Sequence, residues 1–184
     1  MRSLEEAFLI GVEGVTEVWL IRHADCYHEM VEVDDPPLSS IGRDQARRLG
    51  DRVRGSAHAA VYSSPYRRAL ETAQSITQDV RVDQRLVEMP LDIGDDLSLE
   101  FKETPESAVA RMRAVIAELA ERHPGERVVV VSHAASIIAI LTDTMRLEPG
   151  QLRLLPYYTS VSVLRTLAGR SMVGSIGDVA HLDD

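Results

Sequence analysis

Three short stretches of the sequence place arginine, histidine or serine directly after an apolar run. Arg22 and His23 follow VWLI, Ser132 and His133 follow VVVV, and SSPYRRA (63–69) follows AAVY. Open α/β sheets bind their ligands at the carboxyl ends of the strands, so we expect these residues to meet at one edge of a sheet. There they would bring two histidines and at least two arginines into one pocket.

This set of side chains suits phosphoryl transfer. Arginine guanidinium groups bind phosphate oxygens bidentately and stay charged at any working pH. A neutral imidazole is a competent nucleophile toward phosphorus, and a second histidine can stabilise the charge on the transferring group. The leaving alkoxide then needs a proton. Glu88, in RLVEMP beside the expected sheet edge, is the candidate proton donor.

The order of the predicted elements indicates an α/β fold. Strands are expected at 16–23, 57–64, 80–86 and 126–133, with a closing antiparallel pair at 157–167 and 171–179. Helices are expected at 41–55, 66–78, 104–122 and 135–145, and an irregular stretch at 87–103. Because the apolar strands are typical of a sheet covered on both faces, we predict a three-layer α/β/α sandwich with a mostly parallel central sheet.

Length and composition bound the class of protein. The 184 residues, 45% of them hydrophobic, suit one domain over 1–184 with 1–14 as an N-terminal arm. That arm could pack on a neighbouring subunit as readily as on its own chain, so a homodimer is compatible with the sequence. The N-terminus is a poor secretory signal, no apolar run approaches a membrane span, and the single Cys26 suits a reducing compartment, so we expect a cytoplasmic protein.

The net charge of −9 argues against nucleic acid or an anionic membrane as a partner. A small phosphorylated substrate would have to overcome this unfavourable global field. We therefore expect a concave site in which arginines are locally dense.

Four segments resemble signature motifs of the histidine phosphatase superfamily, the phosphoglycerate mutase-like group. LIRHA (20–24) is similar to LVRHG, and DPPLSSIGRDQARRL (35–49) to D-x-P-L-T-x-x-G-x-x-Q-A. SSPYRRALETA (63–73) is similar to S-P-x-x-R-A-x-x-T-A, and VVVVSHAASI (128–137) to V-V-S-H-G. The matches lie in order along the chain. The resemblance implies a phosphoglycerate mutase-like fold, no metal and no dissociable cofactor.

Carried over by position, the resemblance implies a role for each candidate site residue. His23 becomes the nucleophile that accepts the phosphoryl group, and Arg22 and Arg68 become the phosphate clamps. His133 becomes the second histidine of the phosphate pocket, and Glu88 the proton donor. The expected activity is metal-independent hydrolysis of a small phosphomonoester through a phosphohistidine intermediate.

The sequence also departs from the family pattern. Ala24 and Ala134 replace glycines that follow the two histidines, and Asp25-Cys26-Tyr27 stands where the family has Glu-Thr and then a phosphate-binding asparagine. His28 is one candidate replacement for that asparagine. Three residues are candidates for lining the substrate: Cys26, His28 and Ser39.

Two other activities remain open. A phosphoglycerate mutase would use the same phosphohistidine, but it needs extra loops that exclude water, and the segment between Glu88 and Ser132 is short. A phosphate-binding protein that has lost turnover would fit the two Gly-to-Ala departures. The candidate acid favours an enzyme over a binder, because binding alone needs no proton donor.

Two other chemistries are disfavoured by the neighbouring residues. A cysteine phosphatase needs a phosphate-binding loop closed by an arginine, and CYHEMVE (26–32) offers none, so we interpret Cys26 as a lining or packing residue. A zinc site built from His23, His28 and His133 would place a cation beside arginines that repel it.

Overall fold

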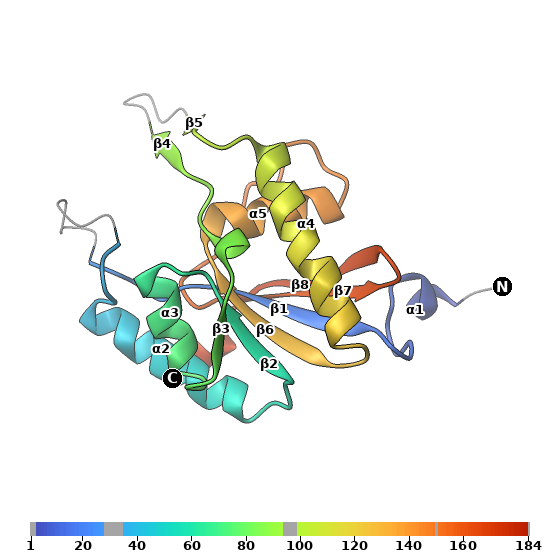
Figure 1. Ribbon diagram of the computed structural model, residues 1–184, viewed down its shortest axis with the longest axis horizontal. Helices are drawn as coiled ribbons and strands as arrows, with labels where there is room; N and C mark the ends of the chain where they lie inside the picture. The colour runs from blue at the N-terminus through green and yellow to red at the C-terminus, as the bar shows by residue number, and fades with distance from the viewer. Residues whose placement is uncertain (1–2, 28–34, 94–98, 150, 184) are drawn as a thin grey trace.

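A six-stranded sheet forms the centre of the computed structural model, which describes residues 3–27, 35–93, 99–149 and 151–183 (Figure 1). The strand order is β3-β2-β6-β1-β7-β8. The parallel strands are β1 (Thr16–Arg22), β2 (Ala60–Ser63), β3 (Val80–Val82) and β6 (Arg127–Ser132). The antiparallel strands β7 (Val161–Leu167) and β8 (Arg170–Asp178) complete one edge. The predicted, mostly parallel sheet is confirmed.

Two pairs of helices cover the two faces of this sheet (Figure 1). On one face lie α2 (Ser40–Arg54) and α3 (Arg67–Gln74), and on the other α4 (Pro105–Arg122) and α5 (Ala134–Thr144). The shorter elements are α1 (Leu4–Ala7), the 3-10 turns η1 (Gln84–Leu86) and η2 (Ala180–Leu182), and the hairpin β4 (Leu91–Ile93) and β5 (Leu99–Phe101). The predicted three-layer arrangement is therefore confirmed.

The alternation of side chains explains why the central strands are apolar throughout. Val128 and Val130 of β6 belong to the core under α4 and α5, whereas Val129 and Val131 belong to the core under α2 and α3. Strands β1 and β6 run parallel in a register that pairs Arg22 with Ser132. The residue that follows each strand therefore emerges at the same edge of the sheet.

The structure corrects several predicted boundaries. Helix α3 begins at Arg67 after the extended Tyr66, not directly after Pro65, and strand β3 ends at Val82 before a 3-10 turn. The stretch 87–103, expected to be irregular, contains the β4–β5 hairpin. The turn between β7 and β8 falls at Ala168-Gly169 as predicted, and both residues have positive φ (49° and 75°), as a two-residue hairpin turn requires.

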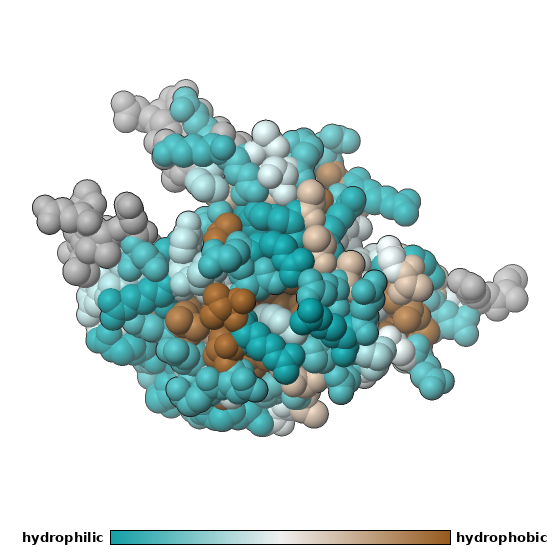
Figure 2. Space-filling view, viewed as in Figure 1, coloured by the Kyte–Doolittle hydropathy of each residue, from teal (hydrophilic) through white to brown (hydrophobic). Residues whose placement is uncertain are grey.

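The surface seen in Figure 2 is hydrophilic over the outer sides of α2 and α4. Apolar side chains gather near the short edge strand β3, where Val82 is 51% exposed (Figure 2). Among the described residues, no helix has both the length and the apolar character needed to cross a membrane.

Candidate active site

The two histidines that follow β1 and β6 face each other. The ring centroids of His23 and His133 are 5.1 Å apart, and both residues are buried. The parallel register of β1 and β6 brings them together, since each residue is the first after its strand. As predicted, the two histidines lie side by side at one edge of the sheet.

A backbone carbonyl determines the tautomer of His23. The Nδ1 atom of His23 lies 2.7 Å from the carbonyl oxygen of Ala24, and a carbonyl oxygen can only accept a hydrogen bond. The proton of the neutral ring therefore resides on Nδ1, and Nε2 carries the lone pair. A nucleophilic imidazole needs this arrangement.

His133 is held by Ser64 and is neutral. Its Nε2 lies 2.8 Å from Ser64 Oγ, while its Nδ1 is buried and has no hydrogen-bond partner in the described part of the chain. Burial, aided by the electrostatic effects of nearby His23 and Arg68, lowers the pKa of His133 well below its usual range. Ser64 Oγ accepts the Tyr66 N–H, so its own proton is available to His133 Nε2. In that tautomer His133 Nδ1 carries a proton and can donate to an anion.

Arg22 lies beside His23 on the face of an aromatic ring. Its guanidinium carbon is 3.9 Å from the ring centroid of Tyr158, and its Nη1 donates to the carbonyl oxygen of Pro156. The Tyr158 ring is 5.9 Å from that of His23. The Nε atom of Arg22 is buried and has no partner among residues 3–27, 35–93, 99–149 and 151–183.

Arg68 mirrors this arrangement on the His133 side. Its guanidinium carbon is 4.8 Å from the ring centroid of Tyr66, and the Tyr66 ring is 5.2 Å from that of His133. Arg68 Nη1 also lies 3.4 Å from a carboxylate oxygen of Asp35. Two arginines, each stacked on a tyrosine, thus flank the histidine pair, and they suit an anion with several oxygens.

Glu88 is partly buried and is anchored by two backbone N–H groups. Its Oε1 accepts the backbone N–H groups of Met89 (2.9 Å) and Ser136 (3.2 Å), which fix one end of the carboxyl group. Burial raises the pKa of Glu88 above its usual value. The carboxyl group therefore keeps its proton to a higher pH than an exposed glutamate would.

A family model described as the histidine phosphatase superfamily (branch 1) matches residues 18–98 and 92–178. The chain belongs to this superfamily. The resemblance read from the four sequence motifs is therefore confirmed.

Relatives of this histidine phosphatase superfamily member carry the names of phosphatases and mutases. The uncharacterized phosphatase PhoE of Bacillus subtilis is 27% identical over 157 residues, which cover 73% of this chain and 80% of the relative. Phosphoglycerate mutase-like protein 4 of Arabidopsis thaliana is 30% identical over 183 residues, which cover 82% of this chain and 78% of the relative. These names support a hydrolase or phosphotransferase activity for the superfamily member described here.

Solved structures share the fold. Phosphoserine phosphatase of Entamoeba histolytica, solved in complex with 3-phosphoglyceric acid, superposes with a TM-score of 0.78 at 22% identity. The match covers 91% of this chain and all of that one. The predicted phosphoglycerate mutase-like fold is confirmed.

The three residues predicted to line the substrate in this superfamily member differ in what the structure shows of them. Cys26 is buried, and burial raises the pKa of its thiol, which disfavours a thiolate nucleophile. The Ser39 hydroxyl caps α2 by accepting the Gly42 N–H and donates to an Asp25 carboxylate oxygen, so it fastens the chain after His23 to that helix. His28 lies outside the described residues.

Three residues of the pocket were not among the predicted site residues: Ser64, Tyr66 and Tyr158. Ser64 and Tyr66 belong to SSPYRRA (63–69), whose resemblance to the family motif pointed to Arg68 alone. Tyr158 had no signal, because it comes from the segment before β7 and reaches the site only through the pairing of β7 with β1.

Proposed function

We propose that this chain is a metal-independent phosphatase that hydrolyses a small phosphomonoester through a phosphohistidine at His23. The observation that carries the proposal is the orientation of two buried, facing imidazoles. Nδ1 of His23 is tied to the Ala24 carbonyl, so that Nε2 is the nucleophile. His133 presents an unpartnered Nδ1 within the described chain, beside Arg22 and Arg68.

The first step forms the phosphohistidine. His23 Nε2 attacks phosphorus while the bond from phosphorus to the ester oxygen breaks, and Glu88 gives its proton to the departing oxygen. The equatorial oxygens carry the developing charge, which Arg22, Arg68 and the Nδ1–H of His133 stabilise. Here the neutral His133 acts as a donor, and the two guanidinium groups supply the positive charge.

The second step releases phosphate. The Glu88 carboxylate accepts a proton from water as the water oxygen attacks phosphorus, and the bond from phosphorus to His23 Nε2 breaks. Inorganic phosphate leaves, and both side chains return to their starting protonation states. One water is consumed for each ester hydrolysed.

A mutase reaction is the second candidate, since one relative is named a phosphoglycerate mutase-like protein. It would pass the phosphoryl group from His23 to a second organic acceptor instead of water. In the described part of the chain, the elements between Glu88 and β6 are the β4–β5 hairpin and α4. So short a segment offers little cover against water and favours hydrolysis.

The test uses p-nitrophenyl phosphate with a chelator present. The purified protein should release phosphate, and His23→Ala should abolish release and prevent trapping of a phosphorylated chain. His58→Ala is the control, because His58 lies before β2 at the opposite end of the strands and contacts the carbonyl of Ser56. Full activity in His23→Ala would refute the proposal. Conversion of a phosphoglycerate to its isomer faster than phosphate release would favour the mutase.

A further inference from the structure

Arg111 of helix α4 makes a two-pronged ion pair beside the Glu88 segment. Its Nε and Nη2 atoms donate to the two carboxylate oxygens of Glu103, each at 2.8 Å. The side chains are only 14% and 18% exposed, and Ser107 Oγ also donates to Glu103. No sequence motif pointed to either member of this pair.

The other donor of the Arg111 guanidinium group reaches the chain that leads into Glu88. Arg111 Nη1 donates to the carbonyl oxygen of Arg85 at 2.7 Å, and Nη2 also donates to Ser136 Oγ at 3.0 Å. Ser136 in turn donates its hydroxyl to the Val87 carbonyl (2.8 Å) and its backbone N–H to Glu88 Oε1 (3.2 Å). Arg111 is therefore linked to the Glu88 carboxyl group through Ser136, by one hydrogen bond to the Ser136 hydroxyl and a second from the Ser136 backbone N–H.

The same pair also closes the base of the β4–β5 hairpin, which projects from the body of the molecule (Figure 1). The hairpin leaves the core directly after Glu88 and returns where Lys102 N–H bonds to the Pro90 carbonyl, one residue before Glu103. Arg111 thus connects Glu103, at the returning end of the hairpin, to Arg85 before Glu88 and to Ser136, which donates to Glu88.

A partly buried ion pair is weak as a source of stability, because desolvation offsets most of its attraction. Its geometric effect is larger, because a proton donor must lie within hydrogen-bond reach of the leaving oxygen. We propose that Arg111, oriented by Glu103, is a positioning residue that holds Glu88 where it protonates the leaving group. This inference rests on the proposed phosphatase function and deepens it.

The test compares two esters of similar size that differ in their need for a proton. p-Nitrophenyl phosphate loses a stabilised phenolate, whereas benzyl phosphate loses an alkoxide that requires protonation. A displacement of about 1 Å can cost roughly a hundredfold in rate. We therefore expect Arg111→Lys and Glu103→Gln to lower kcat/KM for benzyl phosphate by about 10- to 100-fold, with a much smaller loss for p-nitrophenyl phosphate.

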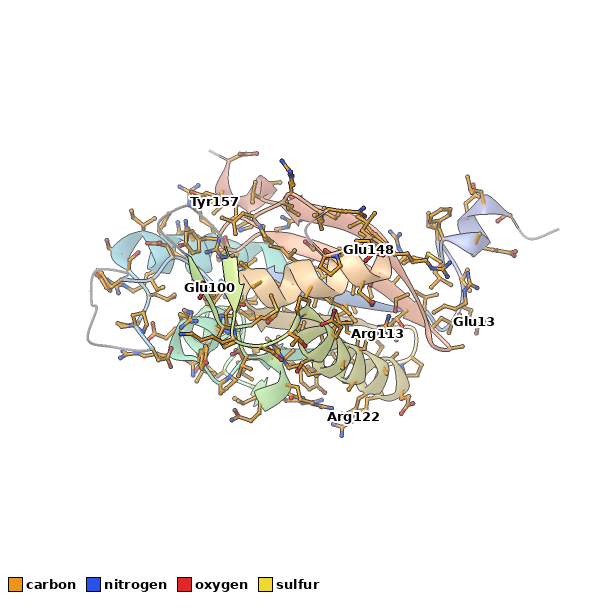
Figure 3. The ribbon with its side chains drawn as sticks, turned by 90° about the horizontal axis from the view of Figure 1, so that it is seen from above. Glu13, Glu100, Arg113, Arg122, Glu148 and Tyr157 are labelled. Carbon is orange, nitrogen blue, oxygen red and sulfur yellow. The ribbon has the colours of Figure 1, made fainter. Side chains whose placement is uncertain are left out.

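The control is Arg113→Met on the same helix. Arg113 is 64% exposed and pairs with Asp143 of α5. Figure 3 shows it well apart from Glu100 of the hairpin. In this variant, kcat/KM for benzyl phosphate and for p-nitrophenyl phosphate should change by the same factor. Glu88→Gln sets the benchmark, since it should show the strongest dependence on the leaving group.

Two results would overturn the inference while leaving the phosphatase in place. One is an equal loss on both esters in Arg111→Lys and Glu103→Gln, which would mark the pair as structural. The other is unchanged kcat/KM for benzyl phosphate in both variants. Failure of the wild-type chain to hydrolyse either ester would instead refute the proposed function itself. Arg111→Lys keeps the positive charge but lacks the planar guanidinium fork, so it tests the geometry of the contacts rather than the charge.

Discussion

The hydrogen bond between Ser64 and His133 offers a sharp test of the site chemistry. Replacing Ser64 with alanine removes the hydroxyl 2.8 Å from His133 Nε2, and neither residue is exposed to solvent. Nothing then prevents the neutral ring from moving its proton to Nε2. In that tautomer Nδ1 would present a lone pair to a phosphate oxygen, which repels instead of donating.

The magnitude follows from burial. Leaving one partner of a buried hydrogen bond unsatisfied costs about 1–3 kcal/mol. If this free energy is lost from the stabilisation of the transition state, kcat/KM for p-nitrophenyl phosphate should fall about 5- to 150-fold in Ser64→Ala. Ser63→Ala is the matched control, because Ser63 is equally buried and its hydroxyl donates to the Ser64 carbonyl rather than to an imidazole.

Nitrogen NMR of histidine-labelled protein reads the tautomer directly. In the wild-type chain, Nδ1 of His133 should give the shift of a protonated ring nitrogen and Nε2 that of an unprotonated one. In Ser64→Ala the proton of His133 should move from Nδ1 to Nε2, and the two nitrogen shifts should exchange accordingly. In Ser63→Ala both shifts should stay as in the wild-type chain. A wild-type His133 protonated on Nε2, or an equal loss of activity in the two serine variants, would show that Ser64 does not set the tautomer.

Two further predictions concern stability. A Cβ at Gly42 would lie 1.9 Å from the Asp25 carbonyl oxygen, so Gly42→Ala should lower the free energy of unfolding by about 1–3 kcal/mol in urea titrations. Gly55→Ala at the C-cap of the same helix should not, because the nearest atom to its Cβ would be the Arg52 carbonyl oxygen at 3.4 Å. Equal unfolding midpoints in the two variants would contradict this. Because the folded pKa of His133 lies below 6.5, the unfolded chain binds more protons as pH falls, and stability should drop by up to about 1.4 kcal/mol per pH unit below pH 6.5. Urea titrations of His133→Gln should show a shallower decline, with the contribution of His181 retained, and an unchanged slope would be the contrary result.

Three of the site residues predicted from the sequence lie at the carboxyl ends of strands: Arg22, His23 and His133. His23 and His133 each come immediately after a strand whose apolar run is unmistakable, so strand and catalytic candidate are identified together. Arg68 lies one residue into α3, in a motif of its own. These residues need only the parallel order of β1, β6 and β2 to converge.

The rest depends on tertiary contacts that leave no local pattern. The β4–β5 hairpin has strands of three residues each, too short to show alternation above the background of a polar loop. Arg111 looks like any arginine on the polar side of an amphipathic helix. The role that we propose for it follows from its contacts with Arg85 and Ser136, which lie 26 and 25 residues away in the sequence.

A chain with a net charge of −9 must attract an anionic substrate to its proposed site. The different charges of the arginines and of His133 explain how it could do so. In the proposed mechanism, the positive charge that attracts phosphate must be local and permanent, a requirement that the guanidinium groups of Arg22 and Arg68 would meet. Their field, added to burial, is what holds His133 neutral. A neutral His133 adds no third positive charge between Arg22 and Arg68. Its Nδ1–H can still donate a hydrogen bond, because its Nε2 is bound to Ser64. The same local charges favour the carboxylate of Glu88, and burial outweighs them to raise its pKa. Burial thus shifts both groups toward their uncharged forms, and in the proposed mechanism His133 then serves as a hydrogen-bond donor, Glu88 as an acid and the two arginines as the cations.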